Sequence, residues 1–341
     1  MPVAAAPSPS DATRPALSWS ARLAPFRHPD LARSVWQLLN TAILFVAGWT
    51  LMYASLRVSY WITLLLAVPT AFMLIRLFII QHDCGHGSFF KSSRAADRIG
   101  GLLGILTLTP YTYWKRTHAM HHASSGNLDY RGFGDIDTLT VREYLAKTRS
   151  QRLKYRLYRH PLVLFVIGPS FHFMLMHRLP AIAPREWTRE RNSILLTDAG
   201  LTAFIVGMGL IIGFKAFFLV HLPLMALSSS LGVWMFYVQH QFEPTYWEHD
   251  EDWSYDSAAL EGSSYYVLPR LLQWLTGNIG LHHVHHLNAR IPNYRLQRVL
   301  DDVPELQNVT RITLWQSLRC ASLALWDEQT RTLVPFPKAQ G

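Results

Sequence analysis

Residues 36–86 read WQLLNTAILFVAGWTLMYASLRVSYWITLLLAVPTAFMLIRLFIIQHDCGH, and their hydrophobic pattern indicates what kind of protein this is. Residues 36–56 carry no charged side chain, and after Arg57 a second apolar stretch covers residues 58–80. Each stretch can cross about 30 Å of hydrocarbon as an α-helix. We therefore expect a tight helical hairpin across a membrane, with His82 and His86 close to its end.

A second pair of apolar stretches lies late in the chain. Residues 194–214 are interrupted by Asp198, residues 216–239 contain no Asp, Glu, Lys or Arg, and Lys215 lies between the two stretches. This pair predicts a second hairpin. The fold class expected is therefore an all-α membrane protein with four transmembrane helices in two hairpins.

The composition of the chain agrees with a membrane protein. Of the 341 residues, 50% are hydrophobic and 16% are charged, against about 25% charged residues in an ordinary soluble domain. The two cysteines, Cys84 and Cys320, lie far apart, which argues against a disulfide framework and against a CxxC metal motif. A reducing, cytoplasm-facing environment fits this usage.

The positive charge is placed as in a protein of the cytoplasmic (inner) membrane. Residues 91–159 carry 13 Lys and Arg residues, and the residues before 34 carry four. The positive-inside rule then predicts a multi-pass protein whose N-terminus and long loops face the cytoplasm. Because this placement accounts for most of the net charge of +9, we expect membrane lipids and no nucleic acid as partners.

Three segments of the chain are expected. Residues 1–33 are rich in Ala, Pro, Ser and Arg, and they are expected to form a flexible cytoplasmic tail without a signal peptide. Residues 34–310 form the membrane domain, and residues 311–341 form a cytoplasmic C-terminal segment.

Histidines gather in three clusters, HDCGH at 82–86, HAMHH at 118–122 and HHVHH at 282–286. Positions i and i+4 share one face of a helix, so each cluster can direct its imidazoles to one point. His283 points away from the shared face of its cluster; the other eight imidazoles are too many for one tetrahedral zinc and imply two metals. Imidazole suits iron, zinc, copper or nickel. A two-metal site with nitrogen ligands beside apolar helices favours iron and redox chemistry on a lipid-like substrate.

The three clusters can build one site only if they lie on one side of the membrane. The chain between His122 and His282 must then cross an even number of times. This requires that the apolar stretch 161–176 does not cross. That stretch and the stretch 99–114 are short for a span, and both are expected to lie at the interface or within the protein.

The order of these clusters resembles that of the integral-membrane fatty acid desaturases. The flanking sequences HDCGHGSFF, YVQHQFE and IGLHHVHHLNARIPNY are similar to those of the bacterial acyl-lipid branch, which includes Δ5-type and Δ12-type enzymes, and the likeness covers about residues 35–310. It implies a cytoplasmic helical cap that carries a histidine-rich, non-haem di-iron site. It also implies O2 as co-substrate, a cis double bond introduced into a fatty acyl lipid, and a separate, ferredoxin-like electron donor.

The resemblance also implies a ninth histidine ligand outside the clusters, for which His240 is the candidate. The expected metal ligands are His82, His86, His118, His121, His122, His240, His282, His285 and His286. Asn278 lies four residues before His282 and could hold a water near the metals, although an Asn at a helix end is also a common structural choice. Four carboxylates could accept hydrogen bonds from the imidazoles, namely Asp83, Asp129, Asp135 and Asp137.

Two other functions share some of these features. A hydroxylase or ketolase acting on a lipid, an alkane or a carotenoid would use the same scaffold, although the flanking sequences favour desaturation. A membrane carrier or sensor of metals would place its ligands near the middle of the membrane. The clusters here are predicted at helix ends, which disfavours a carrier.

Overall fold

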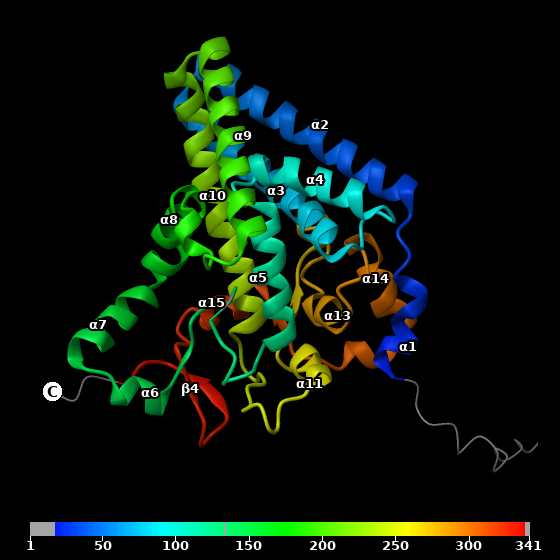
Figure 1. Ribbon diagram of the computed structural model, residues 1–341, viewed down its shortest axis with the longest axis vertical. Coiled ribbons are helices and arrows are strands. Elements are labelled where there is room, and N and C mark those ends of the chain that lie inside the picture. The colour runs from blue at the N-terminus through cyan, green and yellow to red at the C-terminus, as the bar shows by residue number, and fades with distance from the viewer. Residues whose placement is uncertain (1–17, 133, 338–341) are drawn as a thin grey trace, which may run out of the picture.

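The computed structural model describes residues 18–132 and 134–337, and over these residues the protein is mostly helical (Figure 1). The four longest helices are α2 (Leu31–Ser55), α3 (Tyr60–His86), α9 (Thr188–Ile212) and α10 (Phe214–His240). Each is long and apolar enough to cross a membrane. They cover the four spans that the sequence predicts, and α3 and α10 continue beyond the predicted ends, as far as His86 and His240.

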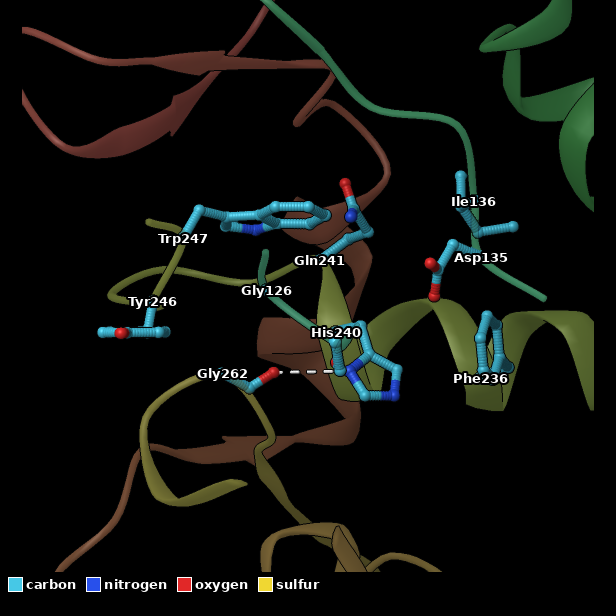
Figure 2. Close-up of a pocket in the computed structure, with 10 residues that line it drawn as sticks. Gly126, Asp135, Ile136, Phe236, His240, Gln241, Tyr246, Trp247 and Gly262 are labelled. Carbon is cyan, nitrogen blue, oxygen red and sulfur yellow. Dashed lines mark hydrogen bonds between the residues drawn. The ribbon is translucent and has the colours of Figure 1, made fainter. Parts of the chain in front are cut away.

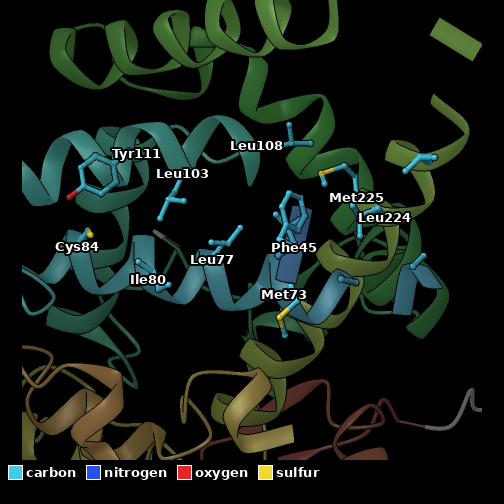
Figure 3. Close-up of a cluster of buried hydrophobic side chains, with 14 of the residues drawn as sticks. Phe45, Met73, Leu77, Ile80, Cys84, Leu103, Leu108, Tyr111, Leu224 and Met225 are labelled. Atoms are coloured by element: carbon cyan, nitrogen blue, oxygen red, sulfur yellow. The ribbon is translucent and has the colours of Figure 1, made fainter. Parts of the chain in front are cut away.

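Helices α2 and α10 pack closely against α3, and α9 packs against α10. In Figure 3, Leu77 and Ile80 of α3 lie near Leu103 of α4 (Ser93–Leu106), and Phe45 of α2 lies near Leu224 of α10; all five are buried in one cluster. A Cβ atom at Gly48 of α2 would lie 2.5 Å from the Thr70 hydroxyl of α3, so only glycine permits this approach. Small residues at such crossings are typical of membrane helices.

The outer faces of these helices expose large apolar side chains. Trp36 is 70% exposed, Leu210 76% and Ile211 77%. In a membrane these side chains would contact lipid, so their exposure agrees with the composition of the spans.

Shorter helices build the rest of the fold. They are α1 (Trp19–Leu23), α5 (Tyr111–Ser124), α6 (Val141–Ala146), α7 (Arg149–Tyr158), α8 (Gly168–Met174), α11 (Tyr255–Leu260), α12 (Arg270–Leu275), α13 (His282–Leu287), α14 (Asn293–Asp302) and α15 (Leu314–Cys320). Single turns are the 3-10 helices η2 (Ala24–Phe26), η4 (Met176–Arg178), η5 (Pro180–Ile182) and η6 (Pro304–Gln307), and η3 (Val163–Ile167) is a π-helix.

The two shorter apolar stretches form bent structure. Residues 99–114 divide between α4 and α5, and residues 161–176 lie mainly in η3 and α8. The segments Arg149–Tyr158 and Val163–Arg178 meet at 56°, which corresponds to a broken span or a re-entrant loop. Counted as one span, this pair would raise the number of crossings from four to five; that residues 161–176 do not cross stays a prediction.

Five short strands correct the all-α expectation. They are β1 (Leu139–Thr140), β2 (Tyr265–Val267), β3 (Arg311–Thr313), β4 (Leu325–Asp327) and β5 (Thr332–Val334). β1 pairs in parallel with β4, β4 pairs antiparallel with β5, and β2 pairs in parallel with β3. Residues 311–337 are therefore tied to the middle of the chain by two of these pairings.

Part of the segment predicted as a flexible tail is helical and packed. Residues 1–17 lie outside the described residues, but α1 and η2 are helical, and Leu23 is fully buried against Val299 and Leu306. Asp30 then caps α2 by accepting from the backbone N–H of Arg33. Because Leu23 belongs to this core, the prediction of a flexible segment is wrong for residues 19–33.

Candidate metal centre

Four helices carry the nine predicted histidines, and they converge at one place. The last turns of α3 hold His82 and His86, and the end of α10 holds His240. The others lie on α5 and α13. α3 ends there because Gly87 takes a left-handed conformation with φ of 66°, which glycine adopts without steric cost.

The nine histidines separate into two groups, and within each group the ligand nitrogens lie within 4.8 Å of one another. The five-histidine group is His82, His86, His118, His122 and His285; the four-histidine group is His121, His240, His282 and His286. His121 and His122 fall into different groups because neighbouring positions on a helix are rotated by about 100°. The rings of His122 and His286 stack at 4.1 Å, so the two groups adjoin.

The nitrogens of the groups fit metal ions. Among the described residues, His86 Nε2, His121 Nε2 and His286 Nε2 are buried without a hydrogen-bond partner. His282 Nε2 lies 2.9 Å from His240 Nε2, and other ring nitrogens meet each other in the same way. Nitrogens that share one ion at about 2.1 Å are about 3 to 4 Å apart, so these spacings suit metal coordination.

Burial disfavours the charged form of five imidazoles outside the long helices. The pKa values of His118, His122, His282, His285 and His286 are all well below the ordinary value, because burial disfavours the charged ring and neighbouring histidines add to the effect. A neutral imidazole offers the lone pair that a metal binds. The site is therefore ready to bind cations at neutral pH.

Two of the four candidate carboxylates hold histidines in place. His82 Nδ1 donates to Asp83 Oδ1 at 3.1 Å, and His121 Nδ1 donates to Asp135. Since a carboxylate only accepts, each contact puts the proton on Nδ1 and leaves Nε2 for a metal. The other two candidates lie elsewhere: Asp129 accepts from His249, and the backbone of Asp137 bonds Tyr155 and Arg159.

A backbone carbonyl likewise holds the proton of His240 on Nδ1. Its Nδ1 donates to the oxygen of Gly262 at 3.3 Å, as the dashed line in Figure 2 shows. Asp135 and Phe236 lie beside this histidine and line the same small pocket. His240, which the sequence placed in no cluster, thus joins the four-histidine group.

Two further residues near the third cluster have other partners. Asn278 has a φ of 57°, and its side-chain amide donates to the backbone oxygen of Asn293 at 3.2 Å. Its role in holding a water stays a prediction. His283 is fully buried and donates to the oxygen of Leu306 at 3.0 Å, outside both groups.

Sequence reasoning missed two contacts of the site. The Trp114 ring stacks on His118 at 4.5 Å. Asn293 donates to Asp83 Oδ2 from both its backbone nitrogen, at 2.7 Å, and its side-chain nitrogen, at 2.8 Å. The spacing of Trp114, four residues before His118, could have suggested the first contact. No local signal points to the second.

A groove of about 900 Å³ lies on the opposite face of α5, between α4 and α9. Thr112, Lys115, Arg116 and Ala119 of α5 line it, whereas His118, His121 and His122 face the other way. Leu102, Ile105 and Leu196 form apolar walls, and Arg98 and Arg189 lie at its charged end. Lys115 pairs with Asp97 at 2.8 Å, and Arg116 pairs with Glu190 at 3.0 Å.

Comparisons with known proteins agree on one family. The family profile described as fatty acid desaturase matches residues 57–316. The chain is 49% identical over 315 residues to a protein named fatty acid desaturase from Bacillus subtilis, covering 92% of this chain and 89% of that protein. It is 29% identical over 225 residues to an sn-1 oleoyl-lipid 12-desaturase of Synechocystis, covering 64% and 62% of the two chains. It is 27% identical over 255 residues to an sn-1 acyl-lipid omega-3 desaturase (ferredoxin) of the same genus, covering 71% and 68%.

Proposed function

The chain belongs to the fatty acid desaturase family, and we propose that its nine clustered histidines hold two iron ions that serve desaturation of a membrane lipid. The chain is an oxidoreductase that introduces a double bond into an acyl chain. In the proposed reaction two adjacent methylenes lose one hydrogen each, and one O2 is reduced to two waters. Two electrons and two protons are supplied from outside the site.

The observation that carries this proposal is the pair of histidine groups. Nine clustered imidazoles, eight of them buried, have lone pairs that face one another, and this arrangement is costly unless cations bind between them. When bound, two irons would supply the redox chemistry that an unactivated methylene requires, because its hydrogens are not acidic. The five-histidine and four-histidine groups would each hold one ion.

The protein groups around the site orient the ligands and keep out water. Asp83, Asp135 and the carbonyl of Gly262 fix the protons of His82, His121 and His240 on Nδ1. The histidines of both groups are buried, apart from the half-buried His86, so few waters compete with an acyl chain. Positioning the chosen methylenes is then the main task of the protein.

A glycerolipid is the substrate that these features support. Two of the relatives described above carry acyl-lipid or oleoyl-lipid in their names. The groove beside α5 combines apolar walls with a charged end, as a phospholipid head group and chain would require. Among the described residues, Arg98 and Arg189 have no acidic partner, which leaves both guanidinium groups available for a phosphate.

The electron donor and the orientation complete the proposal. One relative bears ferredoxin in its name, and a separate, ferredoxin-like protein would deliver the electrons. The positive-inside pattern supports a position in the inner membrane with the histidines facing the cytoplasm. There the helical cap is open to a soluble donor.

Product analysis in a bacterial host tests this function. Cells that express the chain should contain a new unsaturated fatty acid, located by derivatisation and mass spectrometry. The His86→Ala variant should lack the product, and His160→Ala, which changes an exposed histidine outside both groups, should retain it. A hydroxy fatty acid would favour the hydroxylase alternative. The same product in the His86→Ala cells would contradict the assigned site.

A further inference from the structure

Two short helices, α12 and α15, begin at the same edge of the small sheet that β2 and β3 form. α12 follows β2 after two residues, and α15 follows β3 directly. Because β2 and β3 are parallel, their carboxyl ends point in one direction. The Tyr266 hydroxyl of β2 lies 3.1 Å from the Ser317 hydroxyl of α15, so a hydrogen bond joins this strand to this helix. Both helices therefore begin at the same edge of this sheet.

The outward faces of these helices are apolar. The exposed side chains are Leu271 (67%), Trp274 (40%), Leu314 (38%), Trp315 (81%) and Leu318 (57%). We call these five residues the α12/α15 surface. In water they would form exposed apolar area of the kind that usually marks an interaction site.

The α12/α15 surface adjoins the membrane-spanning helices. Arg76 of α3 donates to the backbone oxygen of Trp274, and its guanidinium carbon lies 4.3 Å from the centre of the Trp274 ring. Tyr237 of α10 donates to the oxygen of Cys320 at the end of α15, at 3.1 Å. Arg76 lies ten residues before the end of α3 at His86, which is about 15 Å along the helix axis. The surface thus lies beside parts of α3 and α10 that belong to the spans.

The charged side chains on these two helices have one sign. Residues 262–300 and 306–326, which contain both helices, include no Asp or Glu. Arg270, Arg311 and Arg319 are exposed on or next to these helices. Tryptophan prefers the boundary between hydrocarbon and water, and arginine attracts anionic lipid head groups. This combination fits a lipid surface.

We propose that α12 and α15 lie in the membrane interface and bind a bilayer that contains anionic phospholipids, so that the cap is anchored to the membrane as well as joined to the spans. Leu271, Trp274, Trp315 and Leu318 enter the head-group region, and the arginines contact phosphates. α12 leads through Gly277 and Asn278 to the third histidine cluster. The anchor thereby fixes the depth of His282, His285 and His286 relative to the lipid.

Site-directed labelling tests this anchor in the full-length protein. A cysteine is introduced as Trp315→Cys, labelled with an environment-sensitive fluorophore, and the protein is placed in vesicles of phosphatidylcholine with phosphatidylglycerol. Lipids that carry a nitroxide near the head group should quench the probe at least about twofold. The matched control is Gln329→Cys, an exposed site in the β4–β5 turn, which should show little quenching.

The unmutated protein supplies the blank for this experiment. Cys84 and Cys320 are buried, and burial raises the pKa of Cys320 to about 11, so the unmutated protein should label weakly and serves as the blank. No quenching at position 315, or equal quenching at 315 and 329, would overturn the proposal. Cross-linking of the unlabelled Trp315→Cys thiol to a second copy or to another protein would assign the surface to that partner and would also overturn the proposal. Removing phosphatidylglycerol, or adding Arg319→Gln, should reduce the quenching; unchanged quenching would refute the anionic-lipid contact.

Discussion

Asn293 holds the carboxylate of Asp83 with two hydrogen bonds, at 2.7 and 2.8 Å, across 210 residues of sequence. The other oxygen of that carboxylate accepts from His82. The first histidine cluster is thus connected to the start of α14, just beyond the third cluster. The Asp83 carboxylate thus sets the orientation of His82 and joins the end of α3 to the start of α14.

Asp83→Asn should reduce metal affinity and activity about 10- to 100-fold. An asparagine can accept from His82 with its oxygen, but its NH2 group would then face the two donors of Asn293. The repulsion should rotate the amide and free the His82 ring. The measurement is metal content per chain, together with product formation in the same membranes.

Asn293→Ala should show the same defect more weakly, because Asp83 would keep its bond to His82. Asn308→Ala is the matched control, since Asn308 is exposed and makes no side-chain hydrogen bond among the described residues. Wild-type metal content in both Asp83→Asn and Asn293→Ala would contradict the role given to this contact.

The two histidine groups should lose metal separately. His240→Ala removes one of four ligands, and we expect iron to fall from about two to about one per chain, since a site with three imidazoles binds more weakly. His160→Ala should retain the full amount. Loss of both ions in His240→Ala would show that the groups depend on each other, and retention of both would exclude His240 as a ligand.

Arg159 should be important for the stability of the fold around the end of α10. It is buried, and its guanidinium donates to Tyr237, Gln241 and the backbone oxygens of Asp137 and Leu323, with no carboxylate among its partners. Arg159→Met should lower the free energy of unfolding by about 3 kcal/mol, because these acceptors lose their donor. Thermal unfolding in detergent measures the loss. Arg149→Met, at an exposed site, should unfold like the wild type.

The surface contact around His249 should weaken at high pH. Hydrogen bonds to Asp129 and Glu328 raise the pKa of His249 above its ordinary value of about 6.5. The folded state therefore holds this proton more tightly than the unfolded chain does. The stabilisation is complete below pH 6.5 and is lost as the pH rises through the raised pKa.

The measurement compares unfolding temperatures of wild type and His249→Gln. The difference between them should be larger at pH 6 than at pH 8.5. His160→Gln, which has no acidic partner among the described residues, should differ equally from wild type at both values. A difference in His249→Gln that does not change with pH would contradict the assignment.

The groove beside α5 should affect the use of lipid substrate. Arg98→Gln and Arg189→Gln together should raise the KM for a phospholipid substrate several-fold with little change in kcat, because the head-group contact lies away from the histidines. Arg94→Gln, one helical turn earlier on α4 and outside the groove, is the control. An unchanged KM for lipid together with a raised KM for the electron donor would assign the groove to the donor.

Hydropathy predicted the spans well because a membrane requires long apolar helices with internally paired backbones. The same reasoning could not find the strands. β1 has two residues, and its partner β4 lies 186 positions further along the chain, from Leu139 to Leu325. Such a pairing leaves no local pattern. α1 was missed for a related reason, since its burial depends on Leu23 reaching a core formed by residues near 300.

Helical spacing predicted eight of the nine histidines that gather, because residues three or four positions apart share a face, whereas His240 was expected only from the family resemblance. It did not predict that His118 and His122 belong to one group and His121 to another, since that division depends on where α13 and α10 lie. Among the four carboxylates, only packing distinguishes Asp83 and Asp135 from Asp129 and Asp137. Long-range contacts of this kind are visible only in the folded chain.

The parallel pairing of β3 with β2, and of β4 with β1, orders the biosynthesis of the protein. His82 leaves the ribosome first and His286 much later, but the strands that fasten the cap begin only at Arg311 and Leu325. These strands can therefore pair only after all nine histidines have been synthesised. The fold around the histidine groups is thus expected to close after the last of these histidines has left the ribosome.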